Sequence, residues 1–227
     1  MNDINIPKLP FIGFVEAKTI VENYLTGHGI VFPAQLPIRL PVNVELLAAK
    51  TGCPVSTIDG LRSEFDLRGL VYKNIHKDKF EIIIDSHHYQ EEEYSSSFTI
   101  AEELAHLIIH KSIFEQIYSV EDRIELDSVI NESTRRLIEM QAKRVGSELL
   151  LPDFLFRPYM IKWFESNQKK VDDDRPIDKN DLLLFVSNEV GRRLGLSEHI
   201  IRRALDRSNP ISIIDEIINT YKIKFLS

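Results

Sequence analysis

The chain has almost no cysteine: Cys53 is the one thiol among its 227 residues. No disulfide can therefore form within the chain, and such sparing use of cysteine is typical of a reducing compartment. Cys53 lies in the stretch TGCPV with no basic neighbour, which indicates a small buried apolar side chain rather than a nucleophile.

Long apolar runs and a basic excess are missing as well. No stretch approaches the ~20 apolar residues that span a bilayer. The beginning, MNDINIPKLPFIGF, lacks the basic residues followed by an apolar run that mark a signal peptide. The formal net charge is −7, whereas a general nucleic-acid binder carries a strong basic excess. These absences predict a cytoplasmic protein without membrane contact and without direct nucleic-acid binding.

What the chain does have is the composition of a globular protein, 43% hydrophobic and 28% charged. This length suits one larger domain with a smaller appendage. The polar stretch QKKVDDDRPIDKND, broken by Pro176, is the best candidate for a linker. We therefore expect a core domain over residues 1–170 and a helical region over residues 176–227.

Apolar spacing predicts the main elements. Strands are expected over 67–73 and 79–85, joined by the turn NIHKD, because apolar and other residues alternate there. The following SHHYQEEEYSSS is expected to be a polar loop. Helical spacing predicts helices over 13–29, 42–52, 95–110, 131–151, 153–167, and a pair within 181–205 that turns at Gly195.

Residues 95–110, SSSFTIAEELAHLIIH, carry the strongest chemical signal. Positions i and i+4 of a helix share a face, so Glu102, His106 and His110 form one stripe, with Glu103 beside it. In a His-Glu-x-x-His peptidase helix two histidines bind zinc and the glutamate activates a water. Here Glu102 replaces the first histidine. A carboxylate is also a metal ligand, and it shifts the preference toward manganese or iron.

A metal-free interpretation of the same helix stays open. Thr99 and Glu102 form the Ser/Thr-x-x-Glu pattern of a capping box, so Glu102 can instead bond the backbone at the helix start. His106 and His110 would then be partly buried histidines with ordinary hydrogen-bond partners. The helix alone does not decide between these interpretations.

A second segment, RRLIEMQAKRVGSELLLP, resembles the downstream helix of the ImmA/IrrE metallopeptidases. In that family a glutamate begins the pattern Glu-x-x-Ala-x-x-x-Ala-x-Glu-Leu-Leu-x-Pro and serves as the third zinc ligand. The matching residue is Glu139. Residues 97–110 resemble the family's FTIAHELGHLLLH pattern at nearly every position, with the main departures at 102 and 105. LRGLVYK and EIIID before the helix, and GRRLGLSEHIIRRAL after it, resemble the family in the same order.

The resemblance implies an α+β, zincin-like core over residues 1–170, with a short twisted sheet, an active-site helix and a ligand-bearing second helix. It implies a metalloendopeptidase with one divalent metal ion, zinc in the first place and manganese or iron as alternatives. The ion would be held by Glu102, His106 and Glu139, with Glu103 as general base and His110 as a supporting or alternative ligand. The implied partner is a regulatory protein, such as a helix-turn-helix repressor of a phage or mobile element, or an antitoxin-like regulator.

Two other functions stay open. A peptidase fold can recognise a regulator without cutting it. A DNA-associated regulator would instead work through residues 186–207, a stretch with helix-turn-helix spacing that carries Arg192, Arg193, Arg202, Arg203 and Arg207. The acidic balance of the chain weighs against this last function.

No motif identifies the group that would stabilise a transition state. His87, His88 and Tyr89, in the segment expected to be a loop, are candidates for that role.

Overall fold

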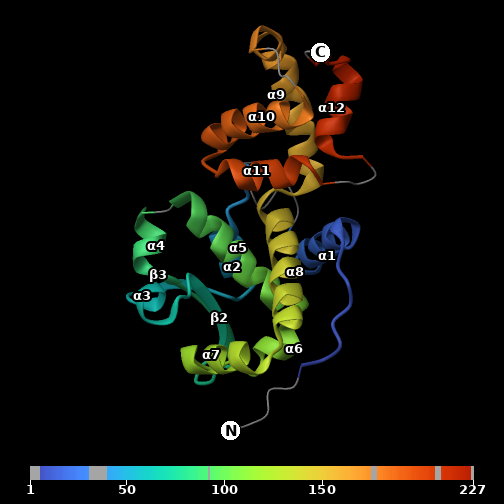
Figure 1. Ribbon diagram of the computed structural model, residues 1–227. Helices are drawn as coiled ribbons and strands as arrows, with labels where there is room; N and C mark the ends of the chain where they lie inside the picture. The colour runs from blue at the N-terminus through green and yellow to red at the C-terminus, as the bar shows by residue number, and fades with distance from the viewer. Residues whose placement is uncertain (1–5, 31–39, 92, 175–177, 208–210, 226–227) are drawn as a thin grey trace. The chain divides into compact units, whose positions relative to one another are not determined.

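The computed structural model describes residues 6–30, 40–91, 93–174, 178–207 and 211–225. The chain forms two compact units, Met1–Leu150 and Leu151–Ser227 (Figure 1). The elements of the first unit are α1 (Phe14–Gly27), α2 (Val44–Lys50), β1 (Val55–Ile58), α3 (Leu61–Phe65), β2 (Gly69–Asn74), β3 (Lys79–Asp85), α4 (Ser86–Glu91), α5 (Glu93–Ile109), α6 (Lys111–Phe114), α7 (Val120–Val129) and α8 (Glu132–Leu150). Those of the second are α9 (Asp153–Asp174), α10 (Lys179–Leu194), α11 (Glu198–Leu205) and α12 (Ile213–Tyr221). The α+β, mostly helical class is confirmed.

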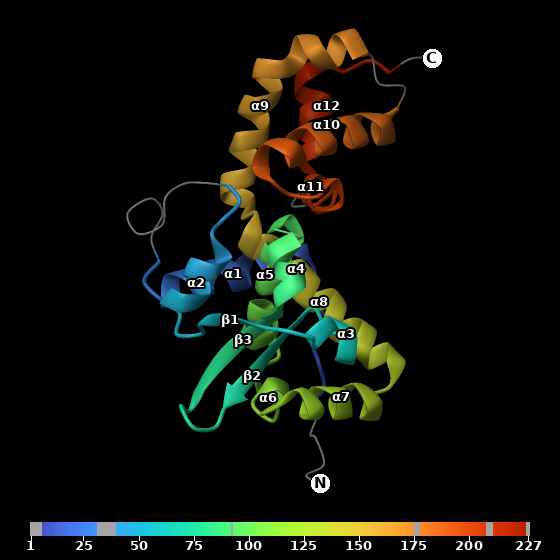
Figure 2. The same cartoon turned by 90° about the vertical axis from the view of Figure 1, so that its left-hand side faces the viewer.

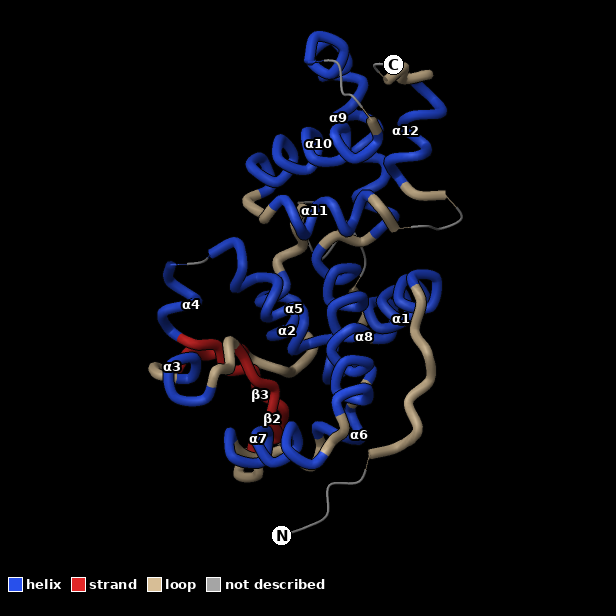
Figure 3. Tube along the Cα trace, viewed as in Figure 1, coloured by secondary structure: helices blue, strands red, loops and turns tan. Residues whose placement is uncertain are grey.

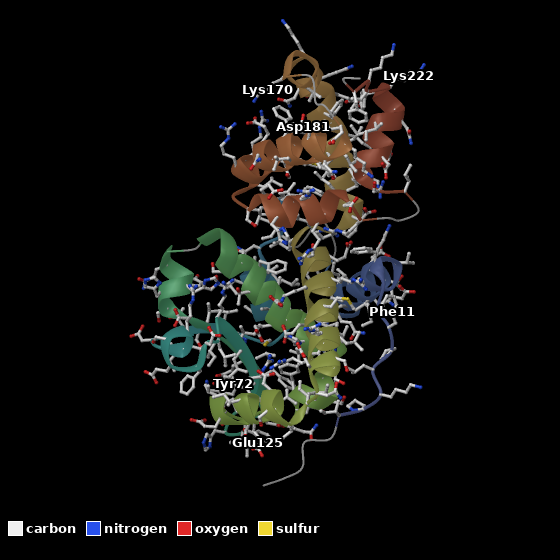
Figure 4. The ribbon with its side chains drawn as sticks, in the orientation of Figure 1. Phe11, Tyr72, Glu125, Lys170, Asp181 and Lys222 are labelled. Atoms are coloured by element: carbon white, nitrogen blue, oxygen red, sulfur yellow. The ribbon has the colours of Figure 1, made fainter. Side chains whose placement is uncertain are left out.

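The first unit contains a three-stranded sheet in the order β1-β3-β2, drawn in red where it is visible in Figure 3. β2 pairs antiparallel with β3, which confirms the predicted hairpin, and β1 pairs parallel with β3. Ile82 and Ile84 of β3 are fully buried. Tyr72 of β2, labelled in Figure 4, donates its hydroxyl to Glu81 Oε2 at 2.8 Å. The sheet therefore has a buried middle strand.

Helix α5 is the centre of this unit. It packs against α8 on one side and against β2 and β3 on another (Figures 1 and 2). Two glycines permit the close approach. A Cβ at Gly69 would lie 2.7 Å from Thr99 Cγ2, and a Cβ at Gly146 would lie 3.0 Å from the backbone of Ala101 and Glu102. The sheet and α8 thus meet α5 at the turn that carries the candidate site.

The segment before α5 is helical, so the prediction of a polar loop over SHHYQEEEYSSS is wrong. Asp85, the last residue of β3, accepts a hydrogen bond from the backbone N–H of His88 at 3.0 Å, which starts α4 directly after the strand. Helix α5 then begins at Glu93, so Thr99 lies inside the helix and not at its N-cap. The capping-box interpretation of Glu102 is therefore wrong as well.

The second unit begins earlier than the expected linker. Helix α9 continues through Pro158 to Asp174 and lies within the second compact unit. Helix α10 ends at Gly195, whose φ of +64° suits glycine. The apolar residues of α12 pack against α9 and α11. None of the described helices is long and apolar enough to cross a membrane.

Candidate metal centre

The five residues singled out from the sequence come from α5, from the residue after it, and from α8. Glu102, Glu103 and His106 are on α5, Glu139 is on α8, and His110 directly follows α5. The exposed fractions are 7% for Glu103 and 1% for both histidines, so these groups face the interior.

His106 and Glu139 are brought together from the two helices. The distance from His106 Nε2 to Glu139 Oε1 is 3.8 Å. Two ligands of one tetrahedral zinc ion, each bonded at about 2.0–2.2 Å, lie roughly 3.4 Å apart. An imidazole nitrogen and a carboxylate oxygen are also the donor types that zinc accepts. This pair therefore fits a divalent cation between its two atoms.

Glu102 instead forms an ion pair with Lys143. Its Oε1 is 3.6 Å from Lys143 Nζ on α8. Within the described ranges no group of three or more His, Cys, Asp or Glu side chains could hold a metal ion. Glu102 would have to leave Lys143 to become the third ligand beside His106 and Glu139.

Arg123 of α7 lies beside the candidate centre, and the sequence did not reveal it. Its guanidinium donates to Glu139 Oε1 at 3.0 Å and to Asp127 Oδ2 at 3.2 Å, and it lies 5.5 Å from the centre of the Phe114 ring. Burial opposes its charge, but Glu103, Asp127 and Glu139 outweigh burial and raise the pKa of Arg123. The spacing of Arg123 and Asp127 is common on exposed helices, so it gave no signal of a buried cation.

Glu103 lies where α5 meets β2. Its Oε2 accepts a hydrogen bond from the backbone N–H of Val71 at 2.9 Å. Burial raises the pKa of Glu103 to about 8, against the opposing effect of Arg123. A carboxyl with a pKa near the working pH is suited to proton transfer. Glu103 therefore has the environment of a general acid or base.

The environment of the two histidines favours their neutral forms. Burial, followed by the positive charge of Arg123, lowers the pKa of His106 well below its usual value. Burial also lowers the pKa of His110. The two Nδ1 atoms lie 3.2 Å apart, and His110 Nε2 lies 2.9 Å from Gln141 Oε1. His110 therefore supports His106 from the side opposite Glu139.

The three candidates for a transition-state stabiliser are on α4. His88 is fully buried, with Nε2 3.0 Å from Thr99 Oγ1, one turn before Glu103 on α5. Tyr89 donates its hydroxyl to Glu45 of α2 at 3.0 Å, and His87 is exposed. His88 thus contacts α5 directly through Thr99.

Several arginines of the basic stretch over residues 186–207 contact other side chains of the same stretch. Arg207 is buried. Three exposed or half-exposed arginines of α10 and α11 have partners within their own unit, in the pairs Arg192–Glu189, Arg202–Glu198 and Arg203–His199. The carboxylates of Glu189 and Glu198 offset part of the positive charge that a DNA-binding surface requires.

Comparisons with known proteins give a matching family model and similar solved structures. The family model described as IrrE N-terminal-like domain, Peptidase_M78, matches residues 62–205, which include all of α5 and α8. A Mycobacterium tuberculosis transcriptional regulator is similar at 14% identity with a TM-score of 0.46, over 88% of this chain. The match covers 49% of that regulator, so the chain spans about half its length. No curated protein matches.

Proposed function

The chain belongs to the IrrE N-terminal-like peptidase family, and on this premise we propose that it is a metal-dependent endopeptidase acting on a regulatory protein. The observation that carries the proposal is the 3.8 Å distance between His106 Nε2 and Glu139 Oε1, two metal-ligand types delivered by separate helices. The partner class is proposed from the family resemblance: a repressor of the helix-turn-helix type or an antitoxin-like regulator.

Each site residue has a proposed role. His106 and Glu139 would hold a divalent cation, and Glu102 would complete the set after leaving Lys143. When bound, the cation would supply Lewis acidity to a water or a carbonyl oxygen. Glu103 would hold or release the proton at its carboxyl group, since burial places its pKa at about 8. Zinc is the first choice, and the two glutamates make manganese and iron the alternatives.

Recognition without cleavage is the second candidate function, and a specific observation favours it. Glu139 is already neutralised by Arg123 at 3.0 Å, and Glu102 is paired with Lys143 at 3.6 Å. Two of the three proposed ligands thus have a protein cation beside them. A peptidase-fold protein in this state would bind a regulator and leave it intact.

The proposal is tested by incubating candidate regulators from the same genome with the full chain and zinc, followed by mass spectrometry of the regulator. We expect two fragments with the natural chain. Glu103→Gln should bind the regulator and leave it whole, while Glu22→Gln, on the exposed side of α1, should cut normally. Binding without fragments in every variant would establish the second function. No binding by any variant would contradict both.

A further inference from the structure

A buried chain of hydrogen bonds runs from the candidate centre to the segment before α1. His106 Nδ1 faces His110 Nδ1 at 3.2 Å, and His110 Nε2 faces Gln141 Oε1 at 2.9 Å. The amide nitrogen of Gln141 donates in turn to the carbonyl oxygen of Pro10. His106, His110 and Gln141 are each at most 1% exposed. Every link except the last carbonyl is therefore shielded from water.

The donor and the acceptor of each hydrogen bond in this series follow from its last member, the carbonyl oxygen of Pro10. A carbonyl oxygen only accepts, so Pro10 fixes the amide group of Gln141 with its nitrogen toward Pro10 and its oxygen toward His110. That oxygen also only accepts, so His110 carries its proton on Nε2. A neutral imidazole has one N–H, which leaves His110 Nδ1 as an acceptor. Two facing acceptors would repel, so His106 Nδ1 must donate.

We infer that Gln141 fixes the tautomer of His106 through His110, so that His106 Nε2 carries a lone pair toward Glu139. Nε2 is the atom that lies 3.8 Å from Glu139 Oε1. A neutral nitrogen lone pair and a carboxylate oxygen at this distance favour a cation between them. Gln141 is therefore a positioning residue, acting on the centre without touching it.

The N-terminal segment holds Gln141 in its orientation. Besides the Gln141–Pro10 bond, Arg144 donates to the carbonyl oxygen of Ile12 at 2.6 Å. The Arg144 guanidinium also lies 5.3 Å from the ring centre of Phe11 and 5.2 Å from that of Phe14. The carbonyls of Pro10 and Ile12 and the rings of Phe11 and Phe14 thus attach this segment and the start of α1 to α8. The segment supplies the carbonyl oxygen of Pro10, and this acceptor determines which atom donates in every other hydrogen bond of the series.

The tautomer can be read directly in the metal-free chain. Long-range proton–nitrogen NMR correlation of 15N-histidine-labelled protein distinguishes protonated from unprotonated ring nitrogens, and His106→Asn assigns the His106 signals. We expect an unprotonated Nε2 and a protonated Nδ1 on His106, and a protonated Nε2 on His110. Gln141→Met keeps the length of the side chain but removes both polar atoms, and it should give a mixture of His106 tautomers.

Zinc titration against a chromophoric chelator supplies the second readout. The inference rests on the proposed function here, since it treats His106 as a ligand. Loss of a partner that orients a metal-bound histidine weakens binding about 10–100-fold. We expect a loss of this size in Gln141→Met. Gln116→Met should match the natural chain, because the Gln116 amide donates to the carbonyl of Ser112 and takes no part in the series of bonds from Pro10 to His106.

The outcomes separate the inference from the proposed function. A protonated Nε2 on His106 in the natural chain would overturn the inference, even if zinc binds. Unchanged tautomer and unchanged zinc affinity in Gln141→Met would overturn it as well. The expected tautomers in a chain that binds no zinc would support the inference and contradict the proposed function. The natural chain alone decides the tautomer if Gln141→Met fails to fold.

Discussion

Arg123 and Glu139 form a partly buried ion pair at the candidate centre. The NH2 group of Arg123 lies 3.0 Å from Glu139 Oε1, and the same oxygen lies 3.8 Å from His106 Nε2. A protein cation and a candidate metal ligand therefore share one carboxylate oxygen. This arrangement couples the stability of the first unit to the charge in the centre.

Arg123→Met is expected to destabilise the metal-free chain by about 1–3 kcal/mol, because it leaves the half-buried carboxylates of Asp127 and Glu139 without their cation. Added zinc should restore part of the loss by supplying positive charge beside Glu139. Urea unfolding with and without zinc measures both effects.

Arg136→Met is the matched control on α8. Its pair with Glu132 is exposed, so its effect should stay within about 0.5 kcal/mol. Equal effects of the two arginine variants would contradict the assignment of Arg123 as the buried cation of the centre.

Glu102→His restores the second histidine of the peptidase helix. We expect zinc affinity to rise by about tenfold, which corresponds to ~1.4 kcal/mol, because imidazole replaces a carboxylate that is paired with Lys143. Lys143→Met should act in the same direction by releasing Glu102. Chelator competition measures both variants, and unchanged affinity in both would remove position 102 from the ligand set.

Gly146→Ala tests the close contact of α8 with α5. The added Cβ would lie 3.0 Å from the backbone of Ala101 and Glu102, which cannot rotate away. We expect a loss of about 1–3 kcal/mol in the free energy of unfolding. Gly27→Ala is the control, since a Cβ there meets nothing within 4 Å. Helix propensity alone should make this control neutral or up to about 1 kcal/mol more stable.

Asp85 makes stability depend on pH below about 4. The backbone N–H of Arg62, and then that of His88, lowers the pKa of Asp85 in the folded chain despite its burial. Because the folded pKa lies below the unfolded one, the stabilisation is complete above the unfolded value and is lost as the pH falls through the folded value.

Asp85→Asn should flatten this pH dependence and lower the stability at neutral pH by about 1–3 kcal/mol, because an amide cannot accept both hydrogen bonds in the same geometry. Chemical unfolding between pH 2.5 and pH 7 measures the effect. Asp59→Asn, at an exposed position, should retain the natural profile. A natural profile in Asp85→Asn would show that another group carries the acid sensitivity.

The sequence predicted those parts of the fold and site that depend on local spacing. The i, i+4 stripe placed Glu102 and His106 on one helix, and the resemblance around Glu139 supplied the helix that packs beside it. Apolar alternation predicted β2 and β3. Each of these signals lies within one short segment, so it can be recognised before any tertiary contact is known.

The features that the sequence missed depend on contacts between distant segments. Strand β1 is four residues long and pairs in parallel with β3, so its own sequence carries little signal. The burial of Arg123 depends on Phe114 and on Glu139 of another helix. Helix α4 begins in a polar segment because Asp85 bonds its first turn. None of these partners is visible from local composition.

Metal content is the most direct test of the central claim, that His106 and Glu139 form a metal centre. The natural chain and Glu139→Ala would be purified without chelator or nickel resin and analysed by inductively coupled plasma mass spectrometry. We predict about one divalent ion per natural chain, zinc in the first place, and its loss in Glu139→Ala. A natural chain that holds no metal and takes up neither zinc nor manganese on addition would contradict it.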